Sequence, residues 1–137
     1  MPPVNKKPQS SSVSDQHKVK SAIGWRFQVN SNVWSPPTDM YETDDKYVVR
    51  VEIAGADEED FTVNVEDHIL VISGVRSEIP ERRAYHQMEI RFGKFLTAVG
   101  LPGLVDYEKS RAEYENGILT VTLPKVQPSR IEIKDTE

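Results

Sequence analysis

Cysteine is absent from this 137-residue sequence, and histidine occurs only three times. Without cysteine the chain has no disulfide, no thiol nucleophile and no thiolate metal ligand, so its stability must come from burial and hydrogen bonding. His17, His68 and His86 are far apart and lack the short spacing of metal-binding motifs. We therefore predict no metal site and no cofactor.

Long apolar runs are also missing. No segment approaches the ~20 apolar residues of a membrane helix, and the N-terminus lacks the uninterrupted apolar core of a secretory signal. With 37% hydrophobic residues and a mean hydropathy of −0.54, the composition is that of one soluble domain. We expect a cytoplasmic protein that does not bind membranes.

Recognisable catalytic motifs are missing too. Gly93-Lys94-Phe95 lacks the upstream glycine and the following serine or threonine of a nucleotide-binding P-loop. The acidic run at residues 57–60 consists of consecutive solvated carboxylates, which have no evident cause for shifted pKa values. We interpret this run as a solubilising turn and predict that the protein is not an enzyme and has no catalytic residues.

The net charge of −5 is unevenly divided along the chain. Residues 1–35 carry a net charge of +4 and residues 36–137 a net charge of −9. The basic side chains of the first segment are scattered, whereas nucleic-acid binding uses clustered ones, so we predict no nucleic-acid partner. We expect this segment to contact acidic surfaces of its own or neighbouring subunits.

The composition changes twice before the first expected strand. Residues 1–22 are rich in serine, lysine, proline and glutamine and hold too few large apolar groups to offset the entropy of ordering, so we expect disorder. Residues 23–34 then contain both tryptophans, Trp25 and Trp34, together with Phe27. Either Trp25 and Phe27 pack on the core of the folded body, or the segment forms an apolar arm for association or for binding exposed apolar surface on other proteins.

Alternation of apolar and polar residues predicts strands from residue 39 onward. The expected extended segments are 39–43, 47–53, 61–65, 69–72, 85–101 with an interruption at Gly93, and the two arms of a hairpin at 111–124. Asn116-Gly117 suits the type I′ turn of that hairpin, and Asp67-His68 permits a second reversal. Residues 75–83 are expected to form an exposed loop, and loops of such length are often functional. About seven strands without an amphipathic helix predict an all-β, antiparallel two-sheet sandwich.

Several motifs together resemble the alpha-crystallin domain of small heat-shock proteins, in the arrangement found in bacteria and plants. In order along the chain they are Trp34-Ser35-Pro36, VVRVEIAG, ILVISG, EIRFGKF, Leu101-Pro102, AEYENGILTVTLPK and Ile131-Glu132-Ile133. The resemblance implies an immunoglobulin-like sandwich at residues 36–125. It also implies a flexible N-terminal arm at residues 1–35 and a C-terminal tail at residues 126–137.

The resemblance further implies three surfaces for binding and assembly. The dimer surface would consist of a loop on one subunit and a strand edge on its partner: Arg82, Arg83, Tyr85, Met40 and Tyr41. The tail residues Ile131 and Ile133 would insert into another subunit between two strands that carry Phe61, Val63, Val65, Ala112 and Tyr114. The client-binding residues of the arm would be Trp25, Phe27 and Trp34.

Three positions depart from the family pattern. Ala54 stands where the family has proline, and Ile90 and Thr97 stand where it has arginine. In the family these arginines help to hold the dimer together, so the sequence does not fix the polar pairing at this interface. Arg91 is the candidate substitute.

The function implied by the resemblance is that of an ATP-independent holdase chaperone, which binds partly unfolded clients as a homo-oligomer built from dimers. Covering the exposed apolar surface of a client prevents its aggregation. A small co-chaperone or scaffold module of the related sandwich class, which does not assemble, remains the alternative. The Ile131-Glu132-Ile133 tail favours the chaperone, because such modules generally lack it.

Overall fold

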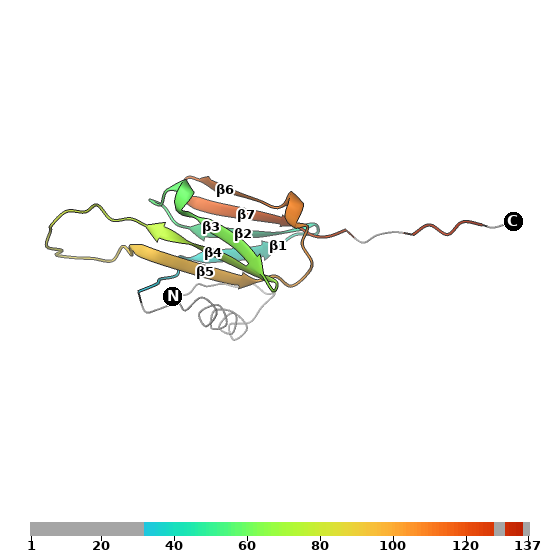
Figure 1. Ribbon diagram of the computed structural model, residues 1–137, viewed down its shortest axis with the longest axis horizontal. Coiled ribbons are helices and arrows are strands. Elements are labelled where there is room, and N and C mark those ends of the chain that lie inside the picture. Colours follow the sequence, from blue (N-terminus) through green and yellow to red (C-terminus); the bar gives the residue numbers. More distant parts are fainter. Residues whose placement is uncertain (1–31, 128–130, 136–137) are drawn as a thin grey trace.

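The computed structural model describes residues 32–127 and 131–135, and it contains two antiparallel sheets packed face to face (Figure 1). The four-stranded sheet has the order β1-β2-β7-β6, and the three-stranded sheet has the order β3-β4-β5. The strands are β1 (Thr38–Glu42), β2 (Lys46–Glu52), β3 (Thr62–Glu66), β4 (Ile69–Arg76), β5 (Gly93–Gly100), β6 (Arg111–Glu115) and β7 (Ile118–Pro124). Two 3₁₀ turns, η1 (Glu58–Asp60) and η2 (Tyr107–Lys109), connect them. The predicted all-β sandwich is confirmed.

Within the described ranges no helix is long and apolar enough to cross a membrane. The apolar side chains of the central strands β2 and β7 face the inside of the sandwich instead. The register pairs Tyr47 with Leu123, Val49 with Val121 and Val51 with Leu119, and all six side chains are buried. Phe95, Leu70 and Ile72 from the facing sheet complete this core. Period-two alternation along each strand is what places these residues on one face.

Both predicted hairpin turns are confirmed by their backbone angles. Asn116 and Gly117 have φ values of 54° and 78°, and Asp67 and His68 have φ values of 52° and 64°. Two consecutive positive φ values characterise the type I′ turn, whose twist matches that of the strands it joins. Glycine is required at position 117 for a second reason, since a Cβ there would lie 2.9 Å from the Cβ of Ala54.

The two sheets stack so that each edge strand of one sheet lies beside an edge strand of the other. Thr38 of β1 contacts Thr97 of β5, so these two strands lie along the same side of the sandwich. On the opposite side Phe61, which precedes β3, packs against Tyr114 of β6. We call these sides the β1/β5 edge and the β3/β6 edge. They place the expected dimer strand and the expected tail-binding strands on opposite sides of one molecule.

The first part of one expected extended segment, residues 85–101, forms no strand in the described chain. Residues 85–92 form no ladder, and β5 begins only at Gly93, whose φ is 94°. The prediction of an extended strand from Tyr85 was therefore wrong for the single chain, because extended residues become a strand only when a neighbour pairs with their backbone. β4 also continues to Arg76, so the long loop comprises residues 77–92 rather than 75–83.

Trp34 lies in the core and not on the arm where we expected it. Its side chain is only 7% exposed, and its ring meets that of Phe95 edge to face with centroids 5.9 Å apart. The backbone N–H of Trp34 donates to the carbonyl of Lys94 at 3.1 Å, and the backbone N–H of Leu96 donates to the carbonyl of Trp34 at 2.9 Å. The expectation that Trp34 is available to clients is thus wrong for this fold. Trp25 and Phe27 lie outside the described residues.

Candidate assembly surfaces

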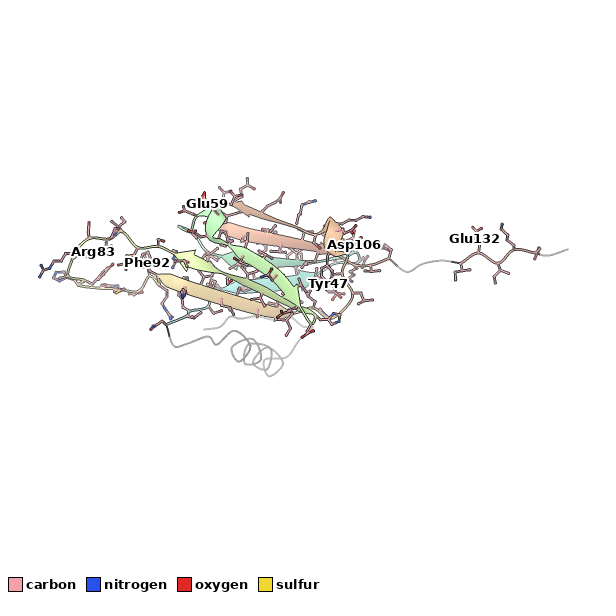
Figure 2. All side chains as sticks on the ribbon, in the orientation of Figure 1. Tyr47, Glu59, Arg83, Phe92, Asp106 and Glu132 are labelled. Atoms are coloured by element: carbon pink, nitrogen blue, oxygen red, sulfur yellow. The ribbon has the colours of Figure 1, made fainter. Side chains whose placement is uncertain are left out.

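The loop at residues 77–92 projects from the end of β4 and β5, and Figure 2 shows Arg83 near its tip and Phe92 at its base. Large apolar side chains are exposed along it: Ile79 by 68%, Tyr85 by 45%, Met88 by 57% and Ile90 by 64%. A loop with so many exposed apolar groups is typical of a segment that is covered by a partner.

Polar contacts inside the loop hold its tip together. Arg83 donates from Nη2 to the Ile79 carbonyl at 2.7 Å, and the same atom lies 3.4 Å from Glu78 Oε2. The Tyr85 hydroxyl also donates to Glu78, and this hydrogen bond raises the pKa of Tyr85. The guanidinium of Arg83 lies 5.4 Å from the centre of the Tyr85 ring. Two of the three expected loop residues therefore meet, whereas Arg82 is simply exposed.

Arg76 closes the base of the loop, a role that the sequence analysis did not assign. Its Nε and Nη2 donate to the Arg91 carbonyl at 2.9 and 2.5 Å, and its Nη1 donates to the Ala54 carbonyl at 3.0 Å. The guanidinium lies 4.6 Å from the centre of the Trp34 ring, and partial burial lowers the pKa of Arg76. The alternation of β4 could have revealed it, because Arg76 falls on the same face as the buried Ile72.

β1 offers the free strand edge that a second subunit would need. In the described chain β1 pairs only with β2, so the backbone groups on its other side have no ladder partner. Met40 is partly buried against the core, and Tyr41 is 49% exposed. The loop at residues 77–92 shares no ladder with β1 within the molecule. An unpaired edge of this kind favours the addition of a strand from another chain.

The β3/β6 edge brings together the residues expected to receive the tail. The rings of Phe61 and Tyr114 meet edge to face with centroids 4.9 Å apart, and the Tyr114 hydroxyl donates to the Ile53 carbonyl at 2.8 Å. Val63 and Val65 of β3 are partly buried against the core. Ala112 of β6 is exposed. The edge is therefore an apolar surface that is only half covered.

The tail leaves the sandwich from a fixed point. Lys125 Nζ lies 2.5 Å from Glu42 Oε2, and the Lys125 N–H donates to the Asp45 carbonyl at 2.8 Å. The hydrogen bond to Glu42 raises the pKa of Lys125. Residues 131–135 lie apart from the sandwich (Figure 1), and Ile131 and Ile133 are 90% and 95% exposed.

The described residues that were considered for metal binding or catalysis do not form a site. Among residues 32–127 and 131–135, no group of three or more His, Asp or Glu side chains lies close enough to hold a metal ion. His68 and His86 are exposed, and His17 lies outside the described residues. The acidic run at residues 57–60 is exposed and includes the short turn η1.

Comparison with known families finds a match to the model of the Hsp20/alpha crystallin family over residues 39–136. Small heat shock protein C2 of Rickettsia felis is 36% identical over 104 residues, which cover 72% of this chain and 68% of that protein. The 17.4 kDa class I heat shock protein of Arabidopsis thaliana is 39% identical over 102 residues, which cover 72% of this chain and 65% of the relative.

Solved structures of similar proteins have the same fold. Heat shock protein 16.0 from Schizosaccharomyces pombe superposes with a TM-score of 0.63 at 33% identity, covering 75% of this chain and 97% of that chain. A small heat-shock protein from Xylella fastidiosa superposes with a TM-score of 0.61 at 27% identity, covering 74% of this chain and 98% of that one.

Proposed function

Because this chain belongs to the Hsp20/alpha crystallin family, whose members are chaperones, we propose that it is an ATP-independent holdase that binds partly unfolded proteins and suppresses their aggregation. Unfolding clients expose apolar surface, and reversible coverage of that surface keeps them from meeting one another. No catalytic step is part of this function. The proposed place of action is the cytoplasm.

The observation that carries the proposal is the amount of apolar surface left open at assembly positions. Ile131 and Ile133 are almost fully exposed, and the β3/β6 edge is an apolar surface that is half covered. We propose that the tail of one subunit binds the β3/β6 edge of another. Fully burying an isoleucine contributes ~1.5 to 3 kcal/mol, whereas fixing each tail residue costs ~1 to 2 kcal/mol of backbone entropy. A single tail is therefore weak, and several in a closed assembly hold it together while subunits exchange.

Dimers would form through the loop and the free edge of β1. The loop at residues 77–92 would extend along β1 of the partner, with Tyr85 near the partner's Tyr41. Exposed apolar residues in the loop and unpaired backbone groups on β1 support this arrangement. The Xylella fastidiosa relative is described as having a distinct high order structure. We propose that this chain also forms a higher-order assembly.

An aggregation assay tests the function. A thermally unstable enzyme such as citrate synthase is heated with and without the full-length protein, in the absence of ATP, and light scattering is recorded. We expect scattering to fall as the protein approaches stoichiometric amounts. The matched control is an equal mass of serum albumin. Undiminished scattering would contradict the holdase proposal, and a monomeric mass for the intact particle would favour the small non-assembling module.

A further inference from the structure

The outer face of the three-stranded sheet carries an apolar patch that the assembly surfaces above do not include. Leu70, Ile72 and Phe95 face the core. Because side chains alternate along a strand, Val71 of β4 and Ala98 of β5 face the opposite way, and the register pairs them directly. Ile69 and Leu96 pack against this pair. We call these four residues, Ile69, Val71, Leu96 and Ala98, the outer patch.

The outer patch is covered although it lies on an outward face. Val71 is 4% exposed and Ala98 is 5% exposed, and the partly buried apolar side chains packed against them in the described part of the chain are Ile69 and Leu96. On β3, beside the patch, the outward residues Thr62, Asn64 and Glu66 are all exposed. A sheet face that is open to solvent usually carries polar side chains, as β3 does here, whereas the outer patch on β4 and β5 is apolar.

The chain itself enters the sandwich beside this patch. Trp34 pairs with Phe95 along the free edge of β5, and its carbonyl accepts from the Leu96 N–H. Asn32, two residues before Trp34, lies in a turn, so the described chain begins beside this edge of β5. Ala98 lies three residues along β5 from Phe95, about 10 Å away, and the next strand is about 4.8 Å further. Residues 23–31 begin close enough to reach the whole patch.

Residues 23–31 also have a matching pattern. Ile23, Trp25, Phe27 and Val29 occupy alternate positions, with Arg26 and Gln28 between them. In an extended conformation these four apolar side chains face one side. We propose that residues 23–31 of the same chain dock on the outer patch, with Trp25 and Phe27 as the apolar contacts. This contact would hold the aromatic part of the arm against its own body, so Trp25 and Phe27 would have to leave the outer patch before they could bind a client.

The absence of cysteine from the chain makes a direct test possible. A full-length double variant, Gln28→Cys with Asn64→Cys, places one thiol in the segment and one on β3, where Asn64 pairs with Val71. The matched control is Gln28→Cys with Arg50→Cys, because Arg50 is exposed on β2 of the other sheet. Both variants are treated with a short bis-maleimide and resolved by denaturing electrophoresis.

We expect a several-fold higher yield of cross-link within one chain for the Asn64 pair than for the Arg50 pair. Adding Val71→Asp should abolish that excess, whereas Val48→Asp should preserve it, since Val48 is equally buried but lies on the other sheet. Circular dichroism confirms that each variant is folded. Equal yields for the two pairs overturn the proposal. A cross-link between two chains also overturns the proposal, in favour of docking by a second copy. Both outcomes are read from cross-links, so they do not decide the holdase proposal, which the light-scattering assay tests separately.

Discussion

The hydroxyl groups of Thr38 and Thr97 lie 2.8 Å apart and join β1 of one sheet to β5 of the other. Thr38 also donates to the Pro36 carbonyl at 3.0 Å. Since a hydroxyl has one proton to donate, Thr97 is the donor in the pair and Thr38 is the acceptor. Thr97 is 2% exposed. At this position, where the family pattern has arginine, the chain thus has a neutral hydrogen bond between its own sheets.

We expect Thr97→Val to lower the free energy of unfolding by about 1 kcal/mol, the usual contribution of such a hydrogen bond. The substitution keeps the shape of the side chain but removes its donor. Urea denaturation at one fixed protein concentration measures the change. Thr43→Val is the control, because its hydroxyl donates to Asp45 in an exposed turn. An equal effect of both substitutions would mean that the link between the sheets contributes nothing of its own.

Tyr85→Pro should shift the protein from dimer toward monomer. Proline removes one backbone donor from the segment proposed to pair with β1 of the partner, while the core stays intact because Tyr85 lies in an exposed loop. Sedimentation over a dilution series measures the dissociation. Tyr85→Phe serves as the control, since it keeps the backbone donor and loses only the hydroxyl bond to Glu78. A proline variant that stays dimeric at the lowest concentration would exclude Tyr85 from the interface.

Replacing Ile131 and Ile133 together by alanine should reduce a large assembly to dimers. The alanines remove most of the apolar area that the tail can bury, and each lost isoleucine is worth ~1.5 to 3 kcal/mol per tail. Native mass spectrometry of the intact particle reports the result. Glu132→Ala is the control, because its side chain alternates with the two isoleucines and faces the other way in an extended tail. An unchanged particle mass would show that assembly depends on the N-terminal arm.

Removing residues 1–31 should leave a folded protein that protects clients poorly. Aromatic side chains supply large apolar area at little cost in rotamer entropy, and Trp25 and Phe27 are lost in this truncation. Residues from Asn32 onward are kept because Trp34 belongs to the core. The matched control removes only residues 1–22 and retains both aromatic residues. Full protection of citrate synthase by the shorter chain would place client binding elsewhere.

Local patterns were sufficient to predict most of the strands. Alternation along β2 and β7 predicts which side chains are buried, because the period of a strand is set by its own backbone. Asn116-Gly117 and Asp67-His68 predict both hairpins, because the required positive φ values depend on the residues in the turn. The exposed tail with its two isoleucines follows equally from the nearby sequence, since Pro124 ends the last strand.

Contacts between distant segments were decided only by the tertiary structure. Trp34 joins the core because the edge of β5, some sixty residues later, offers it both backbone partners and the ring of Phe95. Residues 85–92 form no strand because nothing in the described chain pairs with them, although their sequence favours extension. Phe61 and Tyr114 meet because two different sheets end on the same side. Pattern and turn chemistry act through neighbouring residues, whereas burial and strand pairing depend on which partners the whole fold brings within reach.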